Sequence, residues 1–257
     1  MTVTAAVLNM VLGLIYVGYG VITLIDMRRH QAELGFSRFG AAWVLMAFTC
    51  GPHHLHHGVH LLGGQQGTGM DVAAVAVGFP AGAIWIWLRL EAFAGGPGDR
   101  LLRGTPMALA LLPTLGGLYA GVLLAQLPRA VFSSNADVVD AIPNLLLVGV
   151  YAAVGAYIIR TQLANHRSLR GWSLSGLALG VVFPTCAAMH GAHALAVLEG
   201  SLDYGAHGTL VDWLAVPAGL FFLAVVRSLS RGTWQDWNRA RRVTPVPQPE
   251  PARAIAG

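Results

Sequence analysis

The sequence is poor in charge. Charged residues make up 11% of the 257 positions, lysine is absent, and the mean hydropathy is +0.59. A soluble domain carries about 25% charged residues, so this composition excludes an ordinary soluble domain. It predicts an integral membrane protein whose first partner is the lipid bilayer. The net charge of +4 is confined to connections and tail, which indicates membrane orientation rather than nucleic-acid binding.

Cysteine is also scarce. The chain has two cysteines, Cys50 and Cys186, and both lie within long apolar segments. This excludes a disulfide-rich extracellular scaffold. Inside a membrane helix each thiol is either a metal ligand or a small buried side chain.

Long apolar runs, by contrast, are abundant, and each approaches the ~20 residues that a bilayer requires. We predict an all-α fold with seven transmembrane helices, at about 5–26, 40–62, 72–93, 106–127, 141–161, 172–198 and 209–229. Arginine is concentrated in alternate connections and after the last span, so the positive-inside rule places the N-terminus outside and the C-terminus in the cytoplasm. We therefore expect a multi-pass protein of the inner (plasma) membrane. The transmembrane domain covers residues 1–238, and the basic, proline-rich tail 239–257 is expected to be disordered.

An internal repeat is visible across the predicted spans. Asn9 and Tyr16 in the first span match Asn144 and Tyr151 in the fifth at a constant spacing. The run Pro80-Ala81-Gly82 in the third span matches Pro217-Ala218-Gly219 in the seventh. We therefore predict two three-helix repeats, about 5–93 and about 141–229, joined by the single helix 106–127. One connecting span gives both copies the same orientation, a parallel repeat found in some transporters.

The chemically informative residues lie in two copies of one motif, Thr-Cys-x-x-x-His-x-x-His. The first copy runs from Thr49 to His57 and the second from Thr185 to His193. Residues spaced by four and seven share one face of a helix, and ionisable side chains in a membrane helix usually mark a functional site. We predict one shared site between spans 2 and 6, in the outer half of the bilayer. Its candidate ligands are Cys50, His53, His54, His57, His60, Cys186, His190 and His193. Its candidate supporting residues are Asn9, Tyr16, Thr49, Asn144, Tyr151, Thr185 and Met189.

Metal or haem binding explains so many costly membrane histidines better than a purely structural polar core. Thiolate and imidazole ligands on the outer side favour copper, with zinc or iron as alternatives. One b-type haem between spans 2 and 6 is a further alternative, because haem iron takes axial histidines. No buried carboxylate is expected beside the histidines, since Asp71 and Asp212 fall at the outer rim of their predicted spans.

Three families share features with these motifs. A seven-span chain with a repeated motif containing Met189-His190 resembles the MHYT membrane sensor domains, and this resemblance implies copper binding and the sensing of small gases. Gly191-Ala192 stand in place of the Tyr-Thr pair of that motif. The run from His53 to His57 is similar to one histidine box of the membrane di-iron desaturases and hydroxylases. The topology is similar to that of the ceramidase-type zinc amide hydrolases, which combine several histidines with an aspartate and a serine.

The functional hypothesis is a metal-binding membrane protein that acts as a sensor, a redox carrier or a metal handler. A membrane metalloenzyme, a zinc hydrolase or iron oxygenase with a lipid-soluble substrate, is the first alternative, and it requires an acid–base group beside the metal. A small-molecule transporter built from the repeat is the second. Whether the chain forms a homo-oligomer or uses a redox partner is left open by its sequence.

Overall fold

The structure is a computed structural model, and it describes residues 2–64, 69–103, 121–122, 125–126, 128, 138–200, 205–233 and 236. Of residues 69–74, 138 and 205–209 it describes the backbone alone. Most of the predicted span 106–127 and the whole tail 239–257 lie outside the described residues. The elements are α1 (Thr2–Leu34), α2 (Arg38–Leu62), α3 (Gly69–Phe93), β1 (Leu101–Leu102), α5 (Val138–Leu169), β2 (Trp172–Ser173), α6 (Leu174–Leu198) and α7 (Gly205–Ser230).

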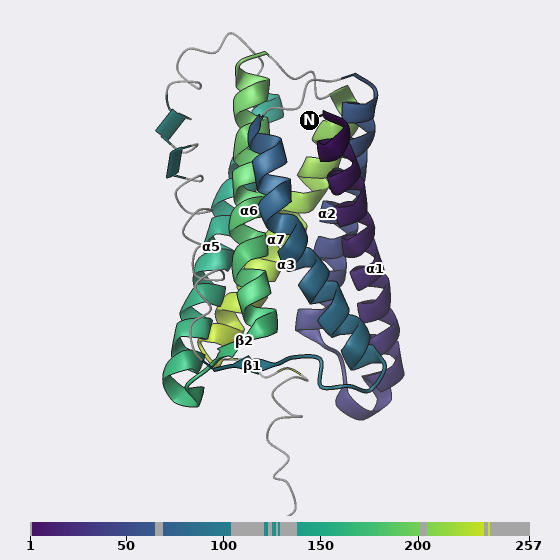
Figure 1. Cartoon of the computed structure of the whole chain (residues 1–257), viewed down its shortest axis with the longest axis vertical. Helices are drawn as coiled ribbons and strands as arrows, with labels where there is room; N and C mark the ends of the chain where they lie inside the picture. Colours follow the sequence, from purple (N-terminus) through teal and green to yellow (C-terminus); the bar gives the residue numbers. More distant parts are fainter. Residues whose placement is uncertain are drawn as a thin grey trace, which may run out of the picture.

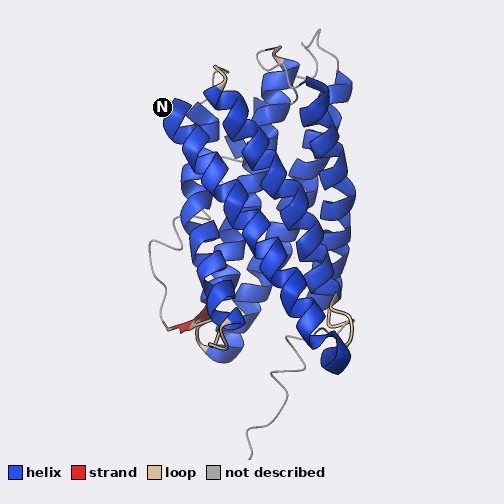
Figure 2. Cartoon of the chain, turned by 90° about the vertical axis from the view of Figure 1, so that its right-hand side faces the viewer, coloured by secondary structure: helices blue, strands red, loops and turns tan. Residues whose placement is uncertain are grey.

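The helices form one elongated bundle (Figures 1 and 2). Helices α1, α3, α5 and α7 run toward the end of the bundle that holds β1 and β2, and α2 and α6 run back (Figure 1). We call this end the strand end. The two short strands pair antiparallel there, with Leu101 opposite Ser173. The sequence did not predict these strands, nor that α1 and α5 would extend eight residues beyond the predicted ends at 26 and 161.

Helix contacts follow a regular scheme. Helix α1 packs against α2 and α3, and α5 packs against α6 and α7. The two groups then meet where α3 contacts α6 and where α7 contacts α2. This set of contacts is unchanged when α1, α2 and α3 are exchanged for α5, α6 and α7.

Within the described part of the chain, five helices are long and apolar enough to cross a membrane, and they lie within α1, α3, α5, α6 and α7. Helix α2 is as long as α3 and α6, at 25 residues, but its five histidines lower its hydropathy. Large apolar side chains such as Val3 and Leu14 of α1 and Leu214 of α7 are more than half exposed, whereas Asn, His and Asp side chains are among the buried residues. Apolar outside and polar inside is the distribution expected of a helical membrane protein, because the lipid chains are the outer solvent.

Close contact between α1 and α2 depends on glycine. A Cβ atom at Gly13 would lie 2.8 Å from the carbonyl oxygen of Gly51, and one at Gly51 would lie 2.7 Å from Val17. Small residues let membrane helices approach until their backbones touch. This approach brings Asn9 of α1 up to His54, one turn of α2 beyond Gly51.

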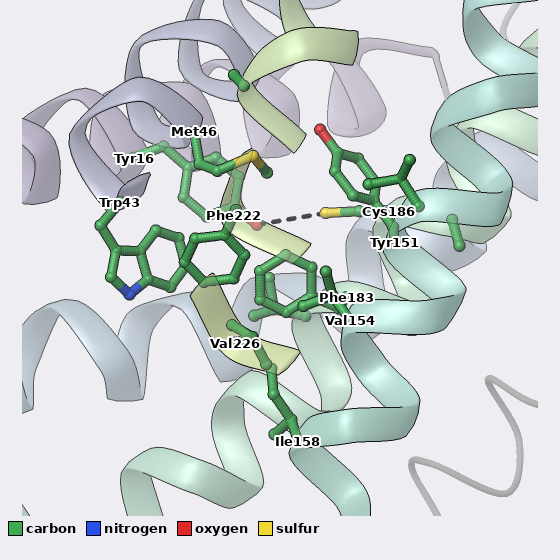
Figure 3. Close-up of a cluster of buried hydrophobic side chains, with 14 of the residues drawn as sticks. Tyr16, Trp43, Met46, Tyr151, Val154, Ile158, Phe183, Cys186, Phe222 and Val226 are labelled. Carbon is green, nitrogen blue, oxygen red and sulfur yellow. Dashed lines mark hydrogen bonds between the residues drawn. The ribbon is translucent and has the colours of Figure 1, made fainter. Parts of the chain in front are cut away.

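The bundle interior has two layers. An aromatic layer lies toward the strand end, where Tyr19 stacks on Trp85 with ring centres 3.6 Å apart and Trp43 lies 4.0 Å from Trp85. Trp43 also contacts Phe222, and both are drawn with their neighbours in Figure 3. The histidine layer begins ten residues further along α2, which is about 15 Å at the rise of an α-helix.

At the strand end each half of the chain caps a helix of the other. Ser37 precedes α2, accepts a hydrogen bond from the backbone N–H three residues on, and donates one to Asp236, which follows α7. Ser173 precedes α6, caps it in the same way, and donates to Asp99, which follows α3. These caps satisfy backbone groups that the first turn of a helix leaves unpaired, and they tie α3 to α6 and α7 to α2.

Candidate metal centre

The two motif stripes face each other between α2 and α6. The ring centre of His53 lies 4.9 Å from that of His190 and 5.3 Å from that of His193, and the rings of His57 and His193 are 4.5 Å apart. Two imidazoles on one tetrahedral ion with bonds of about 2 Å have ring centres about 5 Å apart. All four residues are at most 6% exposed, so the helix faces that carry the motifs have been brought together in the interior.

A carboxylate lies within this group. Asp212 of α7 is completely buried, and its Oδ1 lies 2.9 Å from Nδ1 of His53. Ligand atoms of His53, His190 and Asp212 all lie within 4.8 Å of one another, a spacing at which they could hold one metal ion. The expectation that no buried carboxylate would lie beside the histidines is therefore wrong. Because α7 begins at Gly205 rather than near 209, Asp212 sits about two turns into the helix instead of at its rim.

Asn144 of α5 orients two members of the group. Its Nδ2 donates to Oδ2 of Asp212 at 2.6 Å, and its Oδ1 lies 2.6 Å from Nδ1 of His190. Since the amide oxygen only accepts, Nδ1 of His190 carries the proton in this contact and its Nε2 keeps a lone pair. A hydrogen bond that fixes the tautomer from behind the ring is the usual support of a metal-bound histidine.

Asn9 makes the equivalent contact in the first half of the chain. Its Nδ2 donates to the carbonyl of Ala5 at 2.9 Å, and its Oδ1 lies 2.8 Å from Nδ1 of His54. By the same argument the Nε2 of His54 keeps its lone pair, and among the described residues it has no hydrogen-bond partner. A buried nitrogen without a partner is costly, which makes His54 a further candidate ligand.

The two thiols do not belong to the group of His53, His190 and Asp212. Cys50 lies 3.2 Å from the hydroxyl of Tyr151, and Cys186 lies 3.8 Å from the hydroxyl of Tyr16, the contact drawn as a dashed line in Figure 3. Each pair joins one half of the chain to the other. The tyrosines that were candidates for supporting histidines therefore bond to the cysteines through their hydroxyls, although the ring of Tyr16 also packs 5.4 Å from that of His54.

The remaining candidates lie around the centre. His60 contacts His56, with their Nε2 atoms 3.0 Å apart, on a partly exposed face of α2. The hydroxyls of Thr49 and Thr185 bond to backbone carbonyls three and four residues earlier in their own helices. Met189 is buried and borders, with His54, Val75 and Cys186, a small cavity of about 10 Å³.

This arrangement can act on a metal ion in two ways. Asp212 can ligate the ion directly beside His53 and His190, which gives a nitrogen-and-oxygen site. Alternatively, it can hold Nδ1–H of His53 and present Nε2 of that ring to the ion, as carboxylates behind zinc-bound histidines do. In both cases a buried charge is compensated by its neighbours, as the low polarity of the interior requires.

Comparisons of the chain with family models, with curated proteins and with solved structures found no match. The likenesses to MHYT domains, desaturases and amide hydrolases thus stay predictions.

Proposed function

We propose that this chain is a membrane-embedded metal-binding protein that holds one transition-metal ion between α2, α6 and α7. His53, His190 and Asp212 are its primary ligands, and His193 lies close enough to be the fourth. The observation that carries the proposal is the convergence of their ligand atoms within 4.8 Å in a buried position. Ionisable side chains inside a membrane bundle usually mark a functional site, which supports a role for these three residues beyond structure.

The donor set guides the choice of ion. Imidazole nitrogen and carboxylate oxygen suit zinc, iron and copper(II), whereas copper(I) prefers the soft thiols that here contact tyrosine. A haem between His53 and His190 would need ring centres more than 6 Å apart, at about 2 Å per metal–nitrogen bond, and theirs are 4.9 Å apart. A bare divalent ion therefore fits better than haem, and zinc and iron join copper as equal candidates.

Burial of the whole group favours a permanently held ion over one in transit. His53, His190, His193 and Asp212 are each at most 4% exposed. Such a centre suits a redox carrier or a sensor. The resemblance to the MHYT domains favours a sensor, and this role is a proposal.

Asp212 favours a second function, a membrane metalloenzyme. A metal-activated water needs an acid–base partner within hydrogen-bond reach, and a buried carboxylate at the centre supplies one. From the sequence alone no buried carboxylate was expected beside the histidines, which counted against an enzyme. Asp212 is such a carboxylate.

Metal analysis of detergent-purified protein, prepared without chelators, tests the metal proposal. We expect about one ion per chain in the natural protein and a near-complete loss in His190→Gln and His53→Gln. The matched control is His166→Gln, because this histidine stacks on Trp172 near the strand end, far along the bundle from the centre. Equal metal content in all four proteins would refute the proposal. An absorption spectrum of the same samples distinguishes a bare ion from haem, which gives a Soret band.

We also propose that the two halves arose by duplication and form parallel repeats, with the span 106–127 between them. The helix contacts support this, because they are unchanged when the two sets of three helices are exchanged. Two pairs of hydrogen bonds support it as well: Asn9–His54 corresponds to Asn144–His190. Likewise, Ser37–Asp236 corresponds to Ser173–Asp99.

For the topology we propose that the strand end faces the cytoplasm. Arginines flank this end of the bundle. They are Arg28 and Arg29 in the last two turns of α1, Arg38 at the start of α2, Arg100 and Arg103 after α3, and Arg167 and Arg170 around the end of α5. Reporter fusions after residue 233 test the orientation: a fluorescent protein should fold there, and alkaline phosphatase should stay inactive.

A further inference from the structure

A second pair of histidines lies outside the buried centre. His56 and His60 are one turn apart on α2, and their Nε2 atoms lie 3.0 Å from each other. Both residues are partly exposed, whereas the proposed ligands of the centre are buried. Helix α2 ends at Leu62, at the end of the bundle opposite β1 and β2 (Figure 1). The two rings therefore lie at the surface of the bundle, near the end of a helix.

The distance between the two nitrogens suits a shared ion. Two imidazole nitrogens bound to one ion at about 2.1 Å lie about 3.0–3.4 Å apart, for angles from octahedral to tetrahedral. Histidines at positions i and i+4 of a helix supply such a pair to the zinc ion of a metalloprotease. In the absence of an ion, one of these rings donates a hydrogen bond to the other. A metal ion would replace the proton between the two nitrogens without moving the rings far.

Two features of the chain favour a cation at this place. His60 lies in the last turn of α2, where the unpaired carbonyl groups of the helix carry a partial negative charge. In the second copy of the motif the corresponding positions are Ala192 and Ala196. Helix α6 thus occupies its place in the bundle with alanine there, so packing of this framework does not require the two histidines.

The pair also lies on a line of histidines that leads to the centre. His53, His57 and His60 follow one another at intervals of four and three residues, so they share one face of α2. Exposure decreases along this line, from the partly exposed His60 to 6% at His57 and 4% at His53. A buried metal site needs a path by which the ion enters. These histidines provide one, in steps of about one helical turn.

We propose that His56 and His60 form a second, exchangeable site for a divalent transition-metal ion, and that this site supplies the buried centre. Two histidines leave the other coordination positions of the ion to water, so it binds more weakly here than in the centre and can move on. The two-histidine site stands on its own geometry. Its role as the entry site rests on the proposed function.

Titration of the detergent-purified full chain with copper(II), followed by electron paramagnetic resonance, tests the site. Copper(II) has the highest affinity for imidazole among the first-row divalent ions. The titration uses His190→Gln, in which the centre has lost a ligand, and we expect about one copper ion per chain. Adding His60→Gln should weaken this binding at least about 100-fold, because loss of a group that only supports a ligand already costs up to that factor. Glutamine keeps a hydrogen-bonding group beside His56.

A matched control keeps the number of histidines but changes their spacing. Leu62 is 53% exposed, so Leu62→His can be added to the double variant His190→Gln with His60→Gln at little cost to folding. The new ring lies six residues from His56, on another face of α2, and copper binding should stay weak. Binding restored by this third change, or equal binding with and without His60→Gln, would overturn the proposal.

The entry role is tested by reloading chelator-treated protein with zinc. In His60→Gln we expect the final zinc content of the natural protein, reached more slowly by about the factor lost in affinity when the ion does not fill the pair. His166→Gln should load at the natural rate. Equal loading rates would overturn the entry role, and loss of the final zinc content in His60→Gln would show that the pair belongs to the centre. If the natural protein holds no ion in the centre but the pair binds copper, the proposed function and the entry role fail and the two-histidine site stands.

Discussion

The two halves of the chain place different chemistry at corresponding positions. In the second half Asp212 lies five residues before Pro217, and in the first half Val75 lies five residues before Pro80. His53 follows Cys50 by three residues, and Met189 follows Cys186 by three. One side of the bundle therefore holds the contact between His53 and Asp212, and the other holds Met189 and Val75 beside a 10 Å³ cavity.

This difference teaches which features belong to the framework and which to the centre. The helix caps, the asparagine–histidine hydrogen bonds and the tyrosine–cysteine contacts each occur twice, and exchange of the two halves relates the two members. The carboxylate occurs in one half. The donor set is therefore asymmetric, and on one side of the bundle the ligand atoms of His53, His190 and Asp212 lie close enough to hold one metal ion.

The largest effect is expected from Asp212→Val, which gives the second half the residue of the first. It leaves buried donors of His53 and Asn144 without their acceptor, and each such donor costs about 1–3 kcal/mol. We expect loss of the metal and a clearly lower Tm in detergent, followed by circular dichroism.

The double variant His53→Met with Asp212→Val sharpens this test, because it copies the Met189 and Val75 pair. It should stay free of metal but recover part of the lost Tm, since no buried donor of His53 then remains. Retention of the metal by either variant would contradict the assignment of the centre to this side.

A smaller effect separates the two asparagines. Asn144→Ala removes the group that holds both His190 and Asp212 and should weaken metal affinity about 10- to 100-fold. Asn9→Ala removes the corresponding contact to His54 and should leave that affinity unchanged. Competition with a chromophoric chelator measures both, and equal losses would place His54 among the primary ligands.

The N-caps of α2 and α6 should contribute about equally to stability. Ser37→Ala and Ser173→Ala each remove an N-cap and a hydrogen bond to an aspartate of the other half, and each should cost about 1 kcal/mol. Denaturation in mixed detergent micelles gives both values. A cost several times larger for one of them would show that the two strand-end contacts differ in strength.

The smallest effect is expected at the thiols. Cys50→Ser and Cys186→Ser keep a group that can bond to Tyr151 and Tyr16, so metal content should remain that of the natural protein. Elemental analysis of both variants decides the matter. Loss of the ion in either variant would instead show that the cysteines are metal ligands, as the sequence predicted.

Much of the architecture could be derived from the sequence, because it depends on local properties. Low charge and long apolar runs specify helices for a membrane, and the spacing of Cys50, His54 and His57 places them on one face of α2 whatever surrounds it. The same holds for Cys186, His190 and His193 on α6. That these stripes lie in the interior follows from the cost of polar groups in lipid.

Which of these side chains meet was decided by the tertiary structure. Helical periodicity fixes a face, but the rotation of α2 against α6 and the depth of α7 depend on packing along their whole length. This packing turned the thiols toward the tyrosines of the opposite half, brought His53 to His190, and set Asp212 between them. The only sign in the sequence that Asp212 belongs to the centre was its position in an apolar segment. Its depth in the bundle depends on where α7 begins.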